Sequence, residues 1–351
     1  MNILLGVMMS ERKLATIRRI DELNPIEGAD AIECATVGGW KVVAQKGLYQ
    51  AGDLAVYFEI DSWIPDHIAP FLSKGKEPRE FEGVKGERLR TIRLRGQISQ
   101  GLLIPLKEIV HAIGKQLPNE YITWSEGDDV TELLNIKKWE KPLNAQLAGV
   151  CKGNFPSVIP KTDQERVQNL KKEIAEKRDC VFEVTEKLEG SSCTMYAING
   201  EFGVCSRNLD LKRDENNSFW AVAIRDGIEE KMLSRQYDFA VQGELIGPGV
   251  QGNIYNLKEL EFRVFDIYDI KAGEYMFPEA RRSLTESLGL NHAPVLDDFY
   301  VLNDSIDDLL KLAEGKSRVA DVEREGIVFK ETHGSFSFKA ISNNYLLKSD
   351  R

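Results

Sequence analysis

A lysine followed three positions later by a glycine marks the stretch with the clearest potential for chemistry. Lys187-Leu188-Glu189-Gly190 ends a run that predicts a β-strand, and a lysine amine can attack the α-phosphate of a nucleotide and carry the nucleotide covalently. Glycine lets the backbone turn and approach a phosphate, whereas the lysine needs its pKa of about 10.4 lowered to react well at pH 7. About two such spacings arise by chance in ordinary composition. The tetrad alone therefore indicates no more than an exposed lysine before a turn.

Charged residues at predicted strand ends downstream could complete a site for nucleotidyl transfer. Asn199-Gly200 separates two alternating runs and predicts a two-residue hairpin, whose register sets Ser192 opposite Arg207. We therefore expect Arg207 beside Lys187, where a cation lowers the pKa of an amine and neutralises a phosphate. A surface arginine at a hairpin end has comparable weight. The other candidates at strand ends or turns are Glu244, Phe265, Glu325, Lys330 and Lys339.

Two other features of this part of the sequence are weaker signs of a nucleotide site. Phe265 can stack on a base, although an aromatic residue in a strand more often packs in a core. Residues 247–252 match G-x-G-x-x-G letter for letter. That pattern indicates dinucleotide binding only where it opens a helix in a βαβ unit, and no helix pattern follows here.

Short strands and a few helices must position these residues. Residues 162–165 fit a capping box, and an apolar stripe behind them predicts a helix ending near Lys177, before a strand over 180–187. Pro278 predicts the start of a helix that runs to Leu288, and another helix is expected over 304–314.

The N-terminal part consists of strand patterns separated by turn residues, without a long amphipathic helix, which is typical of a small OB-type barrel. The expected strands are 15–20, 32–37, 40–45, 54–60, 88–95 and 101–105. The sequence predicts an α+β chain with an OB-like β-barrel in residues 1–108. A connecting segment rich in Pro and Gly follows in 109–152, and an antiparallel-sheet domain occupies 153–351.

One predicted strand is strongly basic although the chain is acidic. Five cations against Glu87 give residues 85–95 a local charge of +4, whereas the net charge of the chain is -10. A solvated edge strand whose charges discourage aggregation explains this as well as function does. An OB-like fold favours a grip on nucleic acid. The arginines concerned are Arg88, Arg90, Arg93 and Arg95.

Composition restricts the class of protein. A length of 351 residues favours two domains. No apolar run approaches the 18 residues of a membrane span, and the apolar start lacks the basic segment of a signal peptide. Five scattered cysteines without a C-x-x-C pair argue against a disulfide framework and a zinc site. We expect a soluble cytoplasmic protein that binds no membrane.

In chain order, the candidate residues resemble the covalent nucleotidyltransferase superfamily of ATP-dependent ligases and RNA capping enzymes. The resemblance narrows to RNA ligases of the Deinococcus type, in which an OB domain precedes the catalytic domain; in DNA ligases and capping enzymes it follows. The matching motifs are Lys187-x-x-Gly190, Ser206-Arg207, Gly243-Glu244, Phe265-Asp266, Glu325-Gly326-x-x-x-Lys330 and Lys339. Further similar text lies at 53–61, 100–105, 160–166 and 338–342.

The resemblance implies a role for each candidate. Lys187 would take AMP from ATP and pass it to an RNA 5′-phosphate, after which a 3′-hydroxyl would displace AMP. Glu325 would hold Mg²⁺ or Mn²⁺. The nucleotide would contact Glu186 and Phe265 at adenine, Glu244 at the ribose, Arg207 at the sugar-phosphate, Lys330 and Lys339 at the phosphates, and Leu188 and Gly190 of the tetrad. Relatives often carry Lys where this chain has Ser337, which leaves the division of phosphate binding between Lys330 and Lys339 open.

The resemblance makes an ATP-dependent RNA ligase in RNA repair the favoured function. The expected partner is RNA with 3′-hydroxyl and 5′-phosphate ends in a nicked duplex, sealed by a monomer. A DNA ligase or capping guanylyltransferase is disfavoured by domain order. A non-catalytic RNA-binding relative is disfavoured because Lys187, Glu244, Glu325 and Lys339 are all present.

Overall fold

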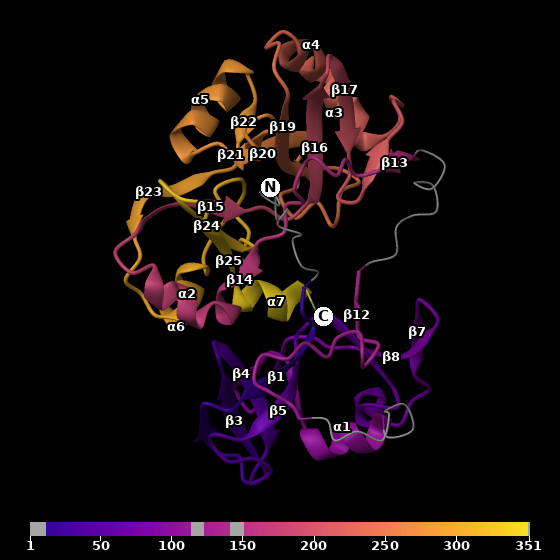
Figure 1. The fold of residues 1–351 in the computed structure, drawn as a ribbon, viewed down its shortest axis with the longest axis vertical. Helices are drawn as coiled ribbons and strands as arrows, with labels where there is room; N and C mark the ends of the chain where they lie inside the picture. The colour runs from indigo at the N-terminus through magenta and orange to yellow at the C-terminus, as the bar shows by residue number, and fades with distance from the viewer. Residues whose placement is uncertain (1–11, 114–122, 141–150, 350–351) are drawn as a thin grey trace, which may run out of the picture. The chain divides into compact units, whose positions relative to one another are not determined.

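The protein is described from a computed structural model (Figure 1), in which two units are distinguished by their internal contacts. One unit comprises Met1–Pro142 and Leu347–Arg351, and the other comprises Leu143–Leu346. No helix among the described residues is long and apolar enough to cross a membrane. The structure describes residues 12–113, 123–140 and 151–349.

Short antiparallel strands in an OB-like arrangement make up the first unit. Their ladders fall into separate sheets, so the described residues form no single closed barrel. Ile17, Val56, Phe58 and Ile104 pack in its core. The ladders are β1 (Ala15–Arg19), β5 (Leu54–Phe58) and β11 (Leu102–Pro105); β2 (Glu22–Pro25), β3 (Ile32–Val37) and β4 (Trp40–Gln45); β12 (Lys137–Lys138), β6 (Ser62–Pro65), β8 (Val84–Arg88) and β7 (Arg79–Phe81); and β9 (Ile92–Leu94) with β10 (Gln97–Ser99).

Part of the predicted connecting segment 109–152 folds with this first unit. Val130, Leu134 and Ile136 are buried in its core, and β12 pairs with β6. The helix α1 (Leu106–Ile113) precedes this part. The rest of the predicted segment, 114–122 and 141–150, lies outside the described residues.

The predicted strand 88–95 is wrong as a single strand. β8 ends at Arg88, and β9 begins only at Ile92. Arg95 and Gly96 adopt positive φ angles of 48° and 84°, which makes them the tight turn that joins β9 to β10. The Arg-Gly turn ends the strand because a two-residue hairpin loop needs this backbone conformation.

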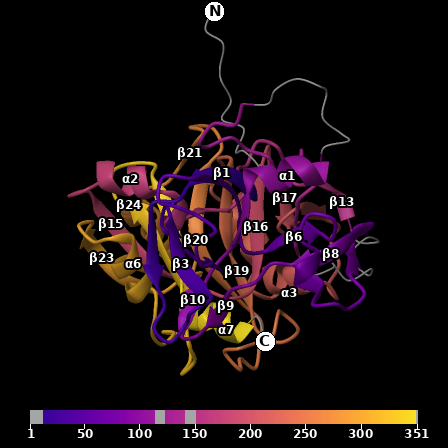
Figure 2. The same ribbon diagram turned by 90° about the horizontal axis from the view of Figure 1, so that it is seen from below.

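Two mainly antiparallel sheets form the second unit (Figures 1 and 2). The larger runs in the order β13 (Cys151–Asn154), β18 (Leu209–Leu211), β17 (Glu201–Cys205), β16 (Ser191–Ile198), β19 (Phe239–Ile246), β20 (Glu261–Asp269) and β21 (Glu274–Tyr275), with β22 (Asn291–His292) beside β20. The smaller runs in the order β14 (Glu165–Arg166), β25 (Ser337–Ile341), β24 (Gly326–Glu331), β15 (Val181–Lys187) and β23 (Val295–Val301).

The hairpin predicted at Asn199-Gly200 is confirmed. Ile198 pairs with Glu201 and Thr194 with Cys205, as the two-residue turn requires. Both turn residues have positive φ angles, 52° and 78°, which Asn and Gly adopt at low cost. The register therefore follows from the turn chemistry.

The helices pack around these sheets, and the one predicted from the capping box is misplaced. Glu165 and Arg166 form β14, which pairs in parallel with Phe338 and Lys339, so strand pairing takes the residues expected to start the helix. The helices predicted near 278–288 and 304–314 are confirmed. The helical segments of this unit are α2 (Lys171–Glu176), α3 (Ser218–Arg225), α4 (Ile228–Leu233), α5 (Pro278–Ser287), α6 (Ile306–Leu312) and the 3₁₀ turn Val167–Asn169. The last helix, α7 (Asn343–Ser349), begins in this unit and ends among the C-terminal residues assigned to the first unit.

Candidate active site

Lys187 is the last residue of β15, and its amine forms an ion pair with a carboxylate just before the neighbouring strand β24. Its Nζ lies 2.6 Å from Oε1 of Glu325, which immediately precedes β24. The ladder sets Lys187 opposite Gly326, so the pairing of β15 with β24 brings together residues that lie 138 positions apart in sequence. About a quarter of the lysine side chain, 27%, is exposed to solvent. The side chain of Lys187 is therefore partly open to solvent.

Glu244, on the larger sheet, belongs to the same group of charges. Burial raises the pKa of Glu244 to about 8; Lys187 opposes this shift and Glu325 adds to it. Gly190 makes the close packing possible, because a Cβ there would lie 2.3 Å from the Leu245 carbonyl oxygen and 2.8 Å from Cγ of Glu244. The glycine of the tetrad thus lets the lysine loop approach β19.

The surroundings of Lys187 favour its protonated form. Burial lowers the pKa of Lys187, but the negative charges of Glu325, Glu244 and Asp163 outweigh it and leave this pKa above its ordinary value. The expectation that Arg207 lowers the lysine pKa is therefore not met, since the nearby carboxylates determine the shift. The amine must lose its proton before it can attack a phosphate.

Arg207 and Lys339 meet at one carboxylate. Asp163 Oδ2 lies 2.7 Å from a guanidinium nitrogen of Arg207, and its Oδ1 lies 3.0 Å from Nζ of Lys339. The Lys339 side chain is only 12% exposed. Two cations expected to bind the sugar-phosphate and the phosphates therefore share a single anion. Sequence reasoning missed Asp163, although it lies in the 160–166 stretch that resembles the ligase family.

Lys330 lies deep between the two sheets. Its Nζ forms an ion pair with Asp266 at 2.7 Å, donates a hydrogen bond to the carbonyl of Phe265 and lies 5.6 Å from that ring's centroid. Burial lowers the pKa of Lys330 to about 8, against the opposing charge of Asp266. Lys330 thus supports Phe265, and its phosphate role remains a prediction.

A buried ion-pair network continues behind Lys330, and sequence reasoning did not find it. Arg281 on α5 pairs with Glu183 of β15 and approaches Asp266 of β20 within 3.6 Å, linking the two sheets. Both Arg281 and Glu183 are almost fully buried. His292 accepts a hydrogen bond from Arg281, and burial lowers the pKa of His292 to about 4.

An apolar cluster beside the lysine contains two of the predicted nucleotide contacts. Leu188 is buried in it, and Phe265 packs against it. Glu186, predicted to contact adenine, is 2% exposed and accepts hydrogen bonds from the Ser317 hydroxyl and the Arg318 backbone amide. Leu188 and Phe265 are thus brought together in one cluster, whereas Glu186 is held by protein groups.

The four arginines predicted to bind nucleic acid differ in their surroundings. Arg88 forms an ion pair with Asp61 at 2.6 Å and lies 4.0 Å from the ring centroid of Trp139. Arg93 and Arg95 are exposed on the β9–β10 hairpin, whereas Arg90 is partly buried. The geometry favours the hairpin arginines over Arg88 as a surface for phosphates.

The carboxylates near Lys187 fit a metal ion that is held partly by substrate. Among the described residues, no three or more His, Cys, Asp or Glu side chains gather as a metal site. Mg²⁺ is usually bound by one or two carboxylates together with substrate phosphates. Glu325, which is paired with Lys187, supplies one such carboxylate.

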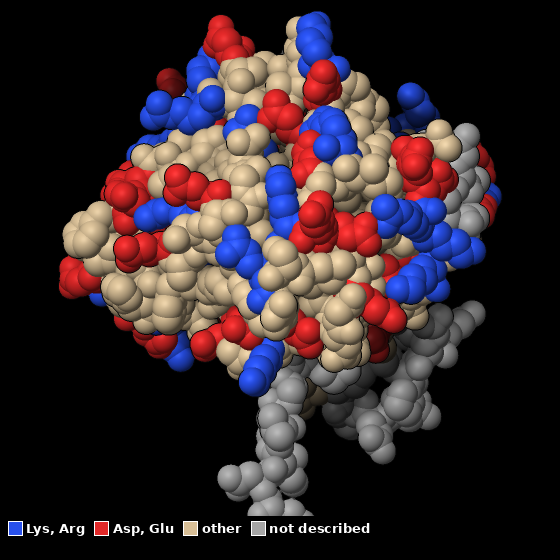
Figure 3. Space-filling view, turned by 90° about the horizontal axis from the view of Figure 1, so that it is seen from above, with Lys and Arg blue, Asp and Glu red and all other residues tan. Residues whose placement is uncertain are grey.

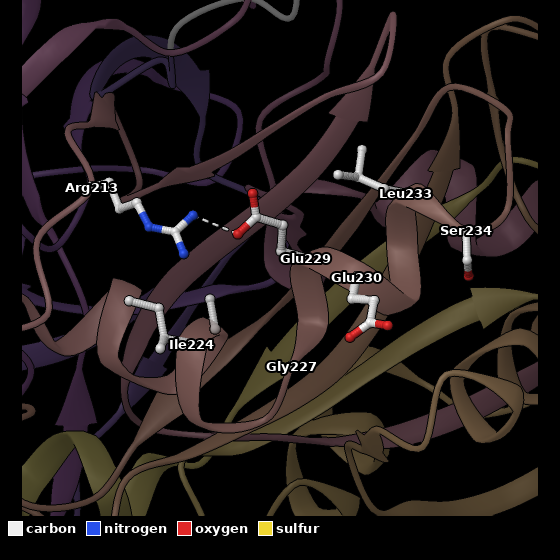
Figure 4. Close-up of a pocket in the computed structure, with 8 residues that line it drawn as sticks. Arg213, Ile224, Gly227, Glu229, Glu230, Leu233 and Ser234 are labelled. Carbon is white, nitrogen blue, oxygen red and sulfur yellow. Dashed lines mark hydrogen bonds and ion pairs between the residues drawn. The ribbon is translucent and has the colours of Figure 1, made fainter.

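Other surface features lie outside this group of residues. A cavity of about 530 Å³ between α3 and α4 is lined by Ile224 and Leu233, with Arg213 and Glu229 paired at 2.5 Å beside it (Figure 4). None of the predicted site residues lines it. The face in Figure 3 shows acidic and basic side chains intermixed without an extended region of one sign.

Comparison with known proteins identifies relatives of both units. A model of the RNA ligase family matches residues 181–341, and a model of an OB-fold domain matches residues 14–106. A solved structure of a Naegleria gruberi RNA ligase mutant with ATP and Mn is 46% identical, with a TM-score of 0.88, and covers 97% of this chain and 100% of that chain.

Two further structures of the Naegleria gruberi RNA ligase show the same similarity. A mutant with AMP and Mn has a TM-score of 0.89, and the enzyme with PPi has a TM-score of 0.88; both are 46% identical and cover 97% of this chain and 100% of theirs. A comparison with curated proteins found no match.

Proposed function

Because the chain belongs to the RNA ligase family and is an ATP-dependent RNA ligase, we propose that it joins RNA 3′-hydroxyl and 5′-phosphate ends through a lysyl-AMP at Lys187. The observation that carries the proposal is the position of Lys187. Lys187 ends β15, its side chain is partly exposed, and its amine feels the charges of Glu325, Glu244 and Asp163.

The proposed reaction consists of three successive nucleophilic substitutions at phosphorus. The Lys187 amine, after losing its proton, forms an N–P bond to the α-phosphorus of ATP as the bond to the leaving pyrophosphate breaks. An RNA 5′-phosphate oxygen then takes the AMP group and releases the lysine, which regains a proton. Finally, a 3′-hydroxyl attacks the activated 5′-phosphate, loses its proton and releases AMP.

Residues of this chain position the nucleotide and balance its charge, which is most of what phosphoryl transfer requires. Arg207 and Lys339 would bind phosphate oxygens in place of Asp163. Phe265, supported by Lys330, would stack on adenine, and Glu244 would contact the ribose. A divalent cation at Glu325 would neutralise phosphate charge and weaken the hold of this carboxylate on the Lys187 proton.

The substrate is proposed to be nicked duplex RNA, sealed by a monomer in a repair reaction. Exposed Arg93 and Arg95 on the β9–β10 hairpin support a grip on the RNA backbone. The test compares sealing of a nicked RNA duplex, the same nick with a 5′-hydroxyl, and the unpaired strands. We expect efficient joining only of the 5′-phosphorylated nick; equal joining of the unpaired strands would contradict this substrate assignment.

A further inference from the structure

The glycine-rich stretch 247–252 opens no helix and instead forms tight turns between β19 and β20. The Val250 amide donates to the Gly247 carbonyl at 3.1 Å, and the Asn253 amide donates to the Val250 carbonyl at 3.0 Å. Gly247 has a φ angle of 121°, and a Cβ there would lie 2.5 Å from the Glu259 carbonyl oxygen. Both the backbone conformation and the neighbouring chain therefore require glycine at this turn.

Asn253 closes the next part of this loop. Its side-chain oxygen accepts a hydrogen bond from the Leu257 amide at 3.1 Å, and its side-chain amide donates to the Leu257 carbonyl at 3.1 Å. The Asn256 amide donates to the Asn253 carbonyl at 2.8 Å. Both asparagines adopt positive φ angles, 44° and 52°, which this residue type tolerates. Tyr255 lies inside this closure, so the loop fixes its place in the chain.

Tyr255 reaches the backbone of the lysine tetrad. Its hydroxyl accepts a hydrogen bond from the Glu189 amide at 2.8 Å. The residue is 4% exposed, and its side chain belongs to the apolar cluster that contains Leu188. Tyr255 therefore joins the 247–257 loop to the tetrad by apolar packing and by a hydrogen bond.

The tetrad is also the connection between the two sheets of this unit. Lys187 ends β15 of the smaller sheet, and Ser191 begins β16 of the larger sheet, so residues 188–190 alone separate the two strands. The next amide of the connection is held as well: burial raises the pKa of Glu244, and a hydrogen bond from the Gly190 backbone opposes this shift. Two successive amides are thus bound by side chains that lie on β19 or follow it.

The backbone of this connection determines where the Lys187 amine can lie. A nucleophile must be in line with the leaving group, and a misplacement of about 1 Å can cost roughly a hundredfold in rate. The lysine side chain is a flexible four-carbon stem, so its aim depends on a fixed backbone. Without the Tyr255 hydroxyl, the partly buried Glu189 amide would lose its acceptor, which favours a different course of the chain.

We propose that Tyr255 is a positioning residue for the adenylation step, and that its hydroxyl fixes the 187–190 connection so that the Lys187 amine faces the α-phosphate of ATP. The inference rests on the proposed function and adds a residue that belongs to none of the matching ligase motifs. It also gives the glycine-rich stretch a task other than dinucleotide binding, which is to carry Tyr255 to the tetrad.

The test makes three measurements on Tyr255→Phe, which keeps the ring and removes the hydroxyl. The single-turnover rate of Lys187 adenylation at saturating ATP should fall by about tenfold to a hundredfold. ATP affinity, measured in a Lys187→Ala background, should stay near that of Lys187→Ala alone, because the apolar cluster keeps its aromatic ring. Sealing of a pre-adenylated RNA nick should stay near wild type, because that step does not use the Lys187 amine as a nucleophile.

Tyr196→Phe is the matched control. The Tyr196 hydroxyl is also buried, donates to the Asp210 carboxylate at 2.8 Å, and belongs to a different apolar cluster. This variant should lose Tm but adenylate at the wild-type rate. Asn253→Ala should slow adenylation, and its combination with Tyr255→Phe should be no slower than Tyr255→Phe alone, because Asn253 acts through Tyr255.

The proposal is overturned if Tyr255→Phe adenylates at the wild-type rate, or if Tyr196→Phe slows adenylation as much. Equal losses of ATP affinity, adenylation and sealing in Tyr255→Phe would also overturn it, because Tyr255 would then support the whole site and not the lysine. Failure of the wild-type protein to form a covalent adenylate would instead contradict the proposed function, and this outcome is distinct because no variant is needed to observe it.

Discussion

Lys187 and Glu325 form the ion pair on which the proposed chemistry depends, and replacing the carboxylate tests its role. Glu325→Gln keeps the size of the side chain but removes the charge available to a cation. We expect lysine adenylation to fall by more than a hundredfold, below that of Phe265→Ala, for which lost stacking costs about tenfold to a hundredfold. Titration of Mg²⁺ and Mn²⁺ measures the effect. Wild-type activity of Glu325→Gln at every metal concentration would make Glu325 a structural residue.

Asp163 forms ion pairs with Arg207 and Lys339, the two cations expected to bind the sugar-phosphate and the phosphates of ATP. Its carboxylate bridges Arg207 and Lys339 at 2.7 Å and 3.0 Å. Asp163→Asn should therefore bind pyrophosphate more tightly, by about threefold to tenfold, because a competing anion is removed. Inhibition of adenylation by added pyrophosphate measures this change. Weaker inhibition in Asp163→Asn would show that Asp163 instead orients the cations for the phosphate.

The raised pKa of Glu244 predicts how the stability of the protein changes with pH. Its pKa is about 8 in the folded protein against the ordinary value of 4.5. Between these values the unfolded chain releases the proton and the folded chain keeps it, so the contribution of Glu244 to stability falls as pH rises through this window. Glu244→Gln should lose less Tm than wild type between pH 6 and pH 9, by a few degrees at roughly 2–4 °C per kcal/mol. Parallel Tm curves for the two proteins would contradict the raised pKa.

The sequence predicted several residues of this site, but not their pairings. Lys187, Glu244 and Glu325 were expected together, and the structure brings their charges close. Asp163 and Arg281 were missed because their partners lie on strands far away in sequence. A motif states which residue types recur along the chain, whereas an ion pair depends on sheet order, which spacing does not encode.

Strand pairing sets the distances between the site residues. Local sequence signals determined which of these elements were predicted correctly. The Asn199-Gly200 hairpin was predicted with its register because two positive φ angles fix the turn. The helix expected from the capping box at 162–165 ends near Lys177 as predicted, but it begins only at Lys171, because Glu165 pairs with Phe338 of β25. Tertiary pairing of this kind has no local signature.

The β9–β10 hairpin provides a test of nucleic-acid binding at the level of one element. Arg93 and Arg95 are exposed on it, whereas Arg88 is held by Asp61 and Trp139. Arg93→Gln with Arg95→Gln should weaken RNA binding and reduce the slope of log affinity against log salt by about one to two. Arg88→Gln is the matched control and should mainly lower Tm. A stronger effect of Arg88→Gln on the salt slope would assign the RNA contact to Arg88.

The two units divide the expected tasks across the whole molecule. Every residue assigned to nucleotide chemistry lies in Leu143–Leu346, and the four arginines lie in Met1–Pro142. The order of the units was predicted from the N-terminal strand patterns and the position of the lysine tetrad. The division also separates adenylation, which needs only ATP and a cation, from sealing, which needs RNA.

Covalent labelling tests the central claim most directly. The purified full chain is incubated with α-labelled ATP and Mg²⁺ or Mn²⁺ in the absence of RNA, denatured and tested for retained label. The account predicts an acid-labile label that is discharged by pyrophosphate, absent with GTP and absent in Lys187→Ala. Label retained by Lys187→Ala, or label formed only with GTP, would contradict the assignment of Lys187 as the nucleophile that accepts AMP.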